Sequence, residues 1–211
     1  MNQTLLHLTV SPRKTESYSR RYGQELVQSL CHANPGLQPT IRDLTSPVLP
    51  LPDEGFVEAS LKPADQRTEK DESALALSEQ LIAELSAASS VVIDTPMHNF
   101  TVPASLKAWV DYIVRPNRTF KNTGSGKVGL LSNRPVFLIV ACGGPVSEAA
   151  GAQTDHLTPY LRYVFQTIGI TDFRSKTLDR MRRGPQRVKQ ADLEALQWTR
   201  QHRLLSNQVA G

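Results

Sequence analysis

Short apolar runs alternate along the chain with segments of helical period. The runs at 4–10, 90–96 and 135–144 are rich in Val, Ile and Leu and have the length of buried strands. Two weaker runs, at 40–45 and 170–178, predict two further strands. Between these runs apolar residues recur at spacings of three and four, which predicts helices over 18–33, 73–88, 103–113, 157–170 and 191–205.

This alternation predicts an α/β fold with a parallel sheet and helices on both faces. Right-handed crossovers have to return each strand to the same edge of the sheet, so the helices must lie across its faces. We expect a flavodoxin-like three-layer sandwich with five parallel strands in the order 2-1-3-4-5. The 211 residues suit a single domain, 1–211. Two connections, 46–72 and 115–134, are much longer than the ~4–6 residues of a typical connection, which is usual for functional or disordered segments.

Composition narrows the functional classes. No apolar run reaches the ~20 residues of a membrane span, and the first residues lack the basic region and cleavage site of a secretory signal, so we expect a cytoplasmic protein. Cys31 and Cys142 lie far apart, and the five histidines are scattered, which indicates neither a disulfide framework nor a metal site. The net charge of +4 favours anionic small molecules, but basic and acidic residues interleave, so composition does not predict nucleic-acid binding.

Three strand ends carry unusual segments where an open α/β sheet binds its ligands. Hydroxyl side chains cluster in 11–19, just before the first helix, whose free N–H groups and partial positive charge suit a phosphate. The alternative is an ordinary N-cap serine. Residues 96–100 follow the third strand, and Gly143 and Gly144 follow the fourth. Without side chains, the backbone at these two glycines can approach a flat ligand closely. The alternative is that they form only the turn from the strand into the next loop. Together the three segments predict a mononucleotide, and FMN is the obvious candidate.

Residues 96–120, PMHNFTVPASLKAWVDYIVRPNRTF, resemble the PMYNFxxPxxLKxxxDxxxRxxxTF signature of FMN-dependent NADH azoreductases. These enzymes are quinone-reducing, flavodoxin-like homodimers. Further similarity lies in 41–44, 74–85 and 157–172, so the resemblance spans nearly the whole chain.

The resemblance implies a role for each strand-end segment. Two positions depart from the family: His98 replaces its usual Tyr, and Ala141-Cys142 replaces its usual polar pair, so side-chain contacts are expected to differ more than backbone contacts. His98 is also a candidate to reach flavin or substrate, whereas Cys142 is expected to be a small residue near the ring. Phe120 is a candidate for the substrate wall. The implied cofactor-binding residues are Ser11, Ser17, Tyr18 and Ser19 at the phosphate and ribityl end, Pro96, Met97, His98, Asn99 and Phe100 along the ring, and Cys142, Gly143 and Gly144 at its pyrimidine edge.

The implied activity is a two-step transfer of two electrons. NADH or NADPH reduces the bound flavin and leaves, and a quinone or azo compound then takes its place. The resemblance also implies a homodimer, with 46–72 and 115–134 forming pocket walls and the dimer interface. It implies neither a nucleic-acid nor a membrane partner, and no catalytic carboxylate pair or metal ligand is needed.

Two other motifs and two other functions are weaker candidates. The stretch GSGK at 124–127 fails the P-loop pattern, with Lys121 where the first Gly should be and Val128 after the Lys. The basic segment 173–189 could bind nucleic acid or the extra phosphate of NADPH, but its lack of interleaved aromatic residues beyond Phe173 favours a solvated loop. The alternative functions are a flavodoxin-fold hydrolase, such as a carrier-protein phosphodiesterase, and a non-catalytic flavin-binding regulatory protein.

Overall fold

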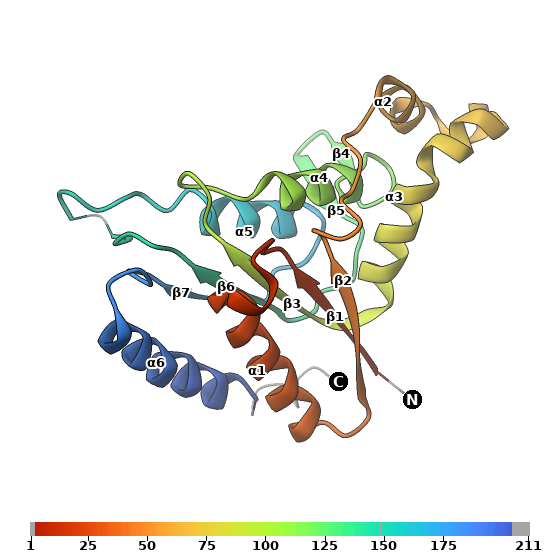
Figure 1. Ribbon diagram of the computed structural model, residues 1–211. Coiled ribbons are helices and arrows are strands. Elements are labelled where there is room, and N and C mark those ends of the chain that lie inside the picture. The colour runs from red at the N-terminus through yellow and green to blue at the C-terminus, as the bar shows by residue number, and fades with distance from the viewer. Residues whose placement is uncertain (1–2, 148, 204–211) are drawn as a thin grey trace.

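A five-stranded parallel sheet forms the centre of the computed structural model, which describes residues 3–147 and 149–203 (Figure 1). The strands of this sheet are β1 (Gln3–Thr9), β2 (Leu37–Asp43), β3 (Ala88–Pro96), β6 (Val136–Ala141) and β7 (Phe173–Leu178). Two short strands, β4 (Phe120–Thr123) and β5 (Gly126–Gly129), lie outside it. The order β2-β1-β3-β6-β7 confirms the predicted 2-1-3-4-5 arrangement, because β4 and β5 form a separate antiparallel hairpin.

Helices cover both faces of this sheet, as the alternation predicts. The helices are α1 (Tyr18–Ala33), α2 (Glu54–Leu61), α3 (Glu69–Ala87), α4 (Ala104–Ile113), α5 (Thr158–Thr167) and α6 (Pro185–Arg203), with short 3₁₀ turns at Lys14–Glu16 and Ala64–Gln66. Figure 1 shows α1 and α6 on one face and α3, α4 and α5 on the other. None of the helices in the described ranges is long and apolar enough to cross a membrane.

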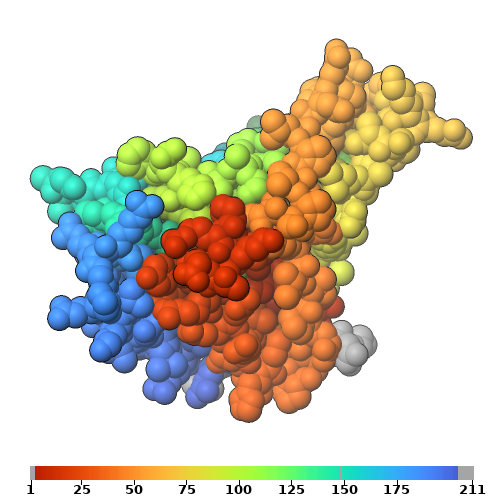
Figure 2. Space-filling view, in the orientation of Figure 1, coloured from red at the N-terminus to blue at the C-terminus, as the bar shows by residue number. Residues whose placement is uncertain are grey.

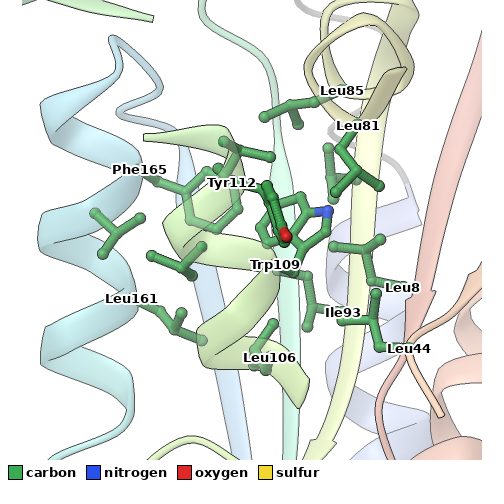
Figure 3. Close-up of a cluster of buried hydrophobic side chains, with 14 of the residues drawn as sticks. Leu8, Leu44, Leu81, Leu85, Ile93, Leu106, Trp109, Tyr112, Leu161 and Phe165 are labelled. Atoms are coloured by element: carbon green, nitrogen blue, oxygen red, sulfur yellow. The ribbon is translucent and has the colours of Figure 1, made fainter. Parts of the chain in front are cut away.

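Two apolar layers hold the helices to the sheet. On the α1 and α6 face, Leu26 and Phe137 belong to one buried cluster. On the opposite face, Trp109 of α4 is fully buried and its ring centroid lies 6.2 Å from that of Phe165 in α5 (Figure 3). Burial on both faces explains why the central strands read as continuous apolar runs.

Helix α1 lies unusually close to the sheet at one glycine. A Cβ atom on Gly23 would stand 2.6 Å from the Cβ of Asp94 in β3, a distance at which something must move. Glycine at this position therefore allows α1 to cross directly over the strand end. The start of the helix is set by Ser17, whose side chain accepts a hydrogen bond from the N–H of Arg20.

Both long connections contain regular structure that the periodicity did not predict. Within 46–72 lies α2, and α3 begins at Glu69 rather than at 73 because Thr68 and Asp71 form a capping box. In Figures 1 and 2, α2 and the start of α3 project beyond the sheet. Within 115–134 lies the β4–β5 hairpin.

The prediction that 173–189 forms a solvated loop was wrong. Residues 173–178 form the edge strand β7, as the separate strand prediction required, and α6 begins at Pro185, six positions before the expected 191. Among the six added residues, 185–190, only Pro185 and Val188 are apolar, so the start of α6 shows no visible period. Leu204 and Leu205, the end of the predicted helix, lie outside the described residues, and the single-domain organisation of 1–211 stays a prediction.

Candidate functional site

A pocket of about 140 Å³ opens at the carboxyl ends of β1, β3, β6 and β7. Figure 2 shows the segment after β1 (red) beside the start of α6 (blue) and below the segment after β3 (yellow-green). The pocket is lined by Ser11, Arg13, Ser17, Tyr18, Ser19, Pro96, Met97, His98, Ala141, Cys142, Gly143, Met181 and Arg182. Nine of the twelve predicted cofactor-binding residues are among them. The other three, Asn99, Phe100 and Gly144, follow lining residues along the chain but do not line the pocket themselves.

Three hydroxyl side chains stand at the start of α1. Ser11, Ser17 and Ser19 are all buried, and the hydroxyl oxygens of Ser17 and Ser19 lie 3.1 Å apart. The helical hydrogen bonds begin with the N–H of Arg21, which donates to the Ser17 carbonyl. The N–H groups of Tyr18 and Ser19 come before this first bond and have no acceptor within the helix. Hydroxyls and free N–H groups at a helix N-terminus form a binding site for a phosphate.

Arg20 fixes the position of this hydroxyl cluster. Its Nε donates to the Ser11 carbonyl at 2.8 Å, and its terminal nitrogen donates to Asp43 at 2.8 Å and to Thr45 at 3.0 Å. Burial by itself would raise the pKa of Asp43, but the hydrogen bonds from Arg20 and Thr45 outweigh it and lower the pKa to about 2. The carboxylate is therefore ionised at neutral pH and ties the loop after β1 to the end of β2.

A strained turn follows β3. The N–H groups of His98 and Thr101 each donate to the other residue's carbonyl at 3.0 Å, which closes a tight two-residue turn. Its central residues, Asn99 and Phe100, have φ values of 45° and 76°. Asparagine tolerates this left-handed region, but phenylalanine rarely adopts it. The turn leaves Phe100 53% exposed, so burial in the core does not explain a large apolar side chain at this position.

The segment after β6 forms the opposite edge of the pocket. The N–H of Cys142 donates to the Leu178 carbonyl at 3.1 Å, and the carbonyl of Cys142 accepts from Met181 at 3.0 Å, so β7 and the residues after it hold this edge. Among the described residues the N–H groups of Gly143 and Gly144 have no backbone acceptor. A Cβ on Gly143 would stand 3.0 Å from Cδ of Arg182, so a side chain there would displace the arginine.

The thiol of Cys142 is buried and poorly suited to act as a nucleophile. Burial, assisted by the charge of Asp179, raises its pKa to about 11, so it stays protonated at neutral pH. We expect Cys142→Ala to keep flavin binding and turnover within about twofold of wild type, because the substitution removes only a sulfur atom from the pocket edge. Steady-state kinetics and mass spectrometry after iodoacetamide treatment would check this. Rapid alkylation of Cys142 at pH 7.5 would contradict it.

Phe120 lies outside the pocket lining. It is buried in the β4–β5 hairpin, with the Lys127 ammonium 5.0 Å from its ring centroid. Its role as a substrate wall stays a prediction.

Four lining residues were not predicted from the sequence: Arg13, Ala141, Met181 and Arg182. The basic segment 173–189 carried the signal for Arg182, but placing it at the pocket requires the β6–β7 pairing. No group of three metal-ligating side chains lies close enough to bind an ion in the part of the chain that is described.

The donors of the pocket fit FMN. Hydroxyl and N–H groups at the start of α1 suit its phosphate, and two side-chain-free residues with available N–H groups suit the edge of a flat ring. The ends of the pocket therefore match the two chemically different ends of this cofactor.

Comparison with known proteins agrees with the fold. The family described as having a flavodoxin-like fold matches residues 3–203. Among solved structures, an azoreductase from Bacillus anthracis strain Sterne superposes with a TM-score of 0.85 at 23% identity, covering 97% of this chain and 99% of its own. An FMN-dependent NADH-azoreductase from the Ames Ancestor strain, solved in complex with FMN, gives a TM-score of 0.83 at 23% identity over 97% of this chain and 100% of its own.

Two curated relatives share more sequence. FMN-dependent NADH:quinone oxidoreductase 2 of Cupriavidus pinatubonensis is 48% identical over 195 residues, 92% of this chain and 95% of the relative. FMN-dependent NADH:quinone oxidoreductase 1 of Hahella chejuensis is 42% identical over 185 residues, 87% of this chain and 88% of the relative. The resemblance seen in the sequence is confirmed, and the chain belongs to the flavodoxin-like family of FMN-dependent NADH:quinone oxidoreductases and azoreductases.

Proposed function

We propose that this chain is an FMN-dependent NAD(P)H oxidoreductase that reduces quinones and azo compounds. The observation that carries the proposal is the convergence of four strand ends on one pocket, in a chain 48% identical over 195 residues to a quinone oxidoreductase. Bound FMN supplies the capacity to accept a hydride from the donor and to pass two electrons to the acceptor.

The protein holds the cofactor and shapes the space above it. Ser11, Ser17 and Ser19 would hold the phosphate together with the first N–H groups of α1. The N–H groups of Gly143 and Gly144, which have no backbone acceptor among the described residues, would donate to the pyrimidine edge, where a reduced flavin gathers negative charge. Pro96, Met97 and His98, which line the pocket, would lie along the ring, with Tyr18 and Cys142 as further contacts.

His98 and Phe100 stand where donor and acceptor would enter. Both side chains are exposed, and the turn between them is closed by two backbone hydrogen bonds. These hydrogen bonds hold the backbone that carries both side chains, so less backbone entropy is lost when substrate binds. Donor and acceptor occupy this position in turn, which gives ping-pong kinetics.

We further propose a cytoplasmic homodimer. Support for an interface comes from the connection 46–72, which exposes four large apolar side chains: Val48, Leu51, Val57 and Leu61. Exposed apolar residues gathered on one projecting segment favour a protein contact. Sedimentation of the purified protein would test the proposal, and a fully active monomer would contradict it.

One experiment separates the proposed function from its alternatives. The protein is purified, its visible spectrum is recorded, and NADH or NADPH is added with and without a quinone. Flavin bands that bleach with the nucleotide and return with the quinone are expected. A protein that does not bind FMN would favour a hydrolase, and bound flavin without turnover would favour a regulatory protein.

A further inference from the structure

Arg182 lies across the pocket edge formed by Gly143, although it comes from the segment that follows β7. A Cβ atom on Gly143 would stand 3.0 Å from Cδ of Arg182 and 3.2 Å from its Cγ and its Nε. Both residues line the pocket. The guanidinium group therefore begins against this glycine, at the edge of the pocket assigned above to the pyrimidine ring.

Backbone hydrogen bonds on both sides of Arg182 hold it at this place. The N–H of Met181 donates to the Cys142 carbonyl at 3.0 Å, and the N–H of Arg183 donates to the Arg180 carbonyl at 2.9 Å. The second of these bonds closes a turn whose two central residues are Met181 and Arg182. The first bond ties this turn to the end of β6, so the arginine stays beside the pocket.

Arg182 is a cation without a partner in the described part of the chain. Within residues 3–147 and 149–203 its guanidinium takes part in no ion pair and no hydrogen bond. Asp179, the one acidic residue of 173–189, pairs instead with Arg180 at 3.2 Å and with Arg187 at 3.4 Å. The charge of Arg182 is therefore available to a ligand in the pocket.

The residues that follow β6 supply no charge of their own at this edge. Ala141 and the two glycines have no ionisable side chain, and burial raises the pKa of the Cys142 thiol to about 11, so it is neutral at pH 7. Arg13, the other cation that lines the pocket, belongs to the phosphate end, where its N–H donates to the Ser11 hydroxyl at 3.3 Å. Arg182 is thus the charged side chain at the pyrimidine edge.

We propose that Arg182 stabilises reduced FMN over oxidised FMN and thereby raises the two-electron reduction potential of the bound cofactor. Uptake of two electrons and one proton, as a hydride from the donor, leaves one more negative charge on the ring, and a cation at its edge favours that state. The phosphate and Arg13 act on the same charge, but they are unchanged when only Arg182 is replaced. The effect of Arg182 is therefore a difference between two oxidation states and needs no overall balance of charge in the pocket. This inference rests on the proposed function for the presence of FMN.

Arg182→Gln tests the proposal by removing the charge from a side chain of similar polarity. The FMN-loaded protein is titrated with a chemical reductant against a dye of known potential, with neither nucleotide nor quinone present. We expect the ratio of the affinities for reduced and oxidised FMN to fall about three- to tenfold, a modest effect because the arginine is exposed and partly screened. For a two-electron couple this fall corresponds to a potential about 15–30 mV lower.

Two further measurements separate this role from a contact with the phosphate. The affinity for oxidised FMN, followed by fluorescence titration, should change by less than about twofold in Arg182→Gln, because the oxidised ring lacks the added charge. The difference in potential between wild type and Arg182→Gln should shrink at high salt, because the cation is exposed to solvent.

Two variants serve as controls. Arg183→Gln removes an adjacent exposed cation that does not line the pocket, and it should leave the potential unchanged. Arg182→Lys keeps the positive charge on a long side chain that can follow the same path past Gly143. It should therefore retain most of the potential that Arg182→Gln loses.

The proposal is overturned if the potential is the same in wild type and Arg182→Gln, and weaker binding of oxidised FMN in that variant would then assign Arg182 to the phosphate. It is also overturned if Arg183→Gln or Arg182→Lys lowers the potential as much, or if Arg182→Gln no longer retains oxidised FMN. A wild-type protein that takes up no FMN loses the proposed function itself. One that turns over NADH and quinone, with a potential independent of Arg182, loses only this inference.

Discussion

Replacing Ser17 by Asp is expected to expel the flavin while leaving the fold intact. Asp is as good an N-cap as Ser and favours the positive end of the helix dipole, so α1 should form normally. The new carboxylate would stand beside the bound phosphate. At about 4 Å and an effective dielectric constant of about 20, two unit charges repel by about 4 kcal/mol, or roughly a thousandfold in affinity. Flavin content by absorbance and FMN affinity by fluorescence titration would measure the loss.

Ser17→Asn is the matched control for this experiment. Asn also caps helices well and has nearly the same shape as Asp, but it adds no charge. It should bind FMN far more tightly than Ser17→Asp, with a similar melting temperature. Equal flavin retention in the Asp variant would place the phosphate away from the start of α1.

Replacing His7 by Leu is expected to destabilise the protein strongly. His7 Nε2 and Asp94 Oδ2 lie 2.7 Å apart, and both side chains are buried. The other carboxyl oxygen of Asp94 has no hydrogen-bond partner among the described residues. Removing His7 leaves the carboxyl buried without its partner, which costs about 3–5 kcal/mol. For a protein of this size the melting temperature should fall by about 6–20 °C in thermal unfolding.

The loss in His7→Leu should grow with pH. Burial raises the pKa of Asp94, and the hydrogen bond from His7 opposes that rise, so its removal raises the pKa further. A carboxyl with a raised folded-state pKa contributes stability that is fully present below its unfolded pKa of about 3.9 and is lost as pH rises toward the folded pKa. Relative to wild type, the melting temperature of His7→Leu should therefore fall as the pH rises from about 4 to about 7.

The double variant His7→Leu/Asp94→Asn is the control for ionisation. It also lacks the histidine, but it has no carboxyl at position 94 to titrate. The part of the melting-temperature loss that grows with pH in His7→Leu should therefore be absent from the double variant. A pH-independent deficit in the single variant would mean that Asp94 does not carry the effect.

Much of the candidate site could be predicted from local sequence. Ser17 precedes a helix of clear period, Gly143 and Gly144 follow an apolar strand, and a parallel sheet must bring such ends to one edge. The exposed, positive-φ geometry of Phe100 could not be predicted, because phenylalanine in that region is unfavourable by itself and is imposed by the hydrogen bonds of the turn.

Contacts between distant segments were not predictable. His7 appeared as one of five scattered histidines, yet its partner lies 87 positions along the chain. Arg20 likewise reaches Asp43 and Thr45 across β2, and Arg182 meets Gly143 through the pairing of β6 with β7. Each contact depends on strand register, which local propensity does not encode.

The sequence by itself determined the order of strands and helices, the edge of the sheet that binds a ligand and the hydroxyls that suit a phosphate. Periodicity and helix capping act over a few residues, so the sequence alone reveals them. The handedness of crossovers is the same in nearly all parallel sheets, so it needs no tertiary information about this chain. Only the tertiary structure decided the buried His7–Asp94 pair, the hydrogen bonds of Arg20 to two other segments and the approach of Arg182 to Gly143. Their energies come from desolvation and charge compensation between surfaces that meet only after the sheet has formed.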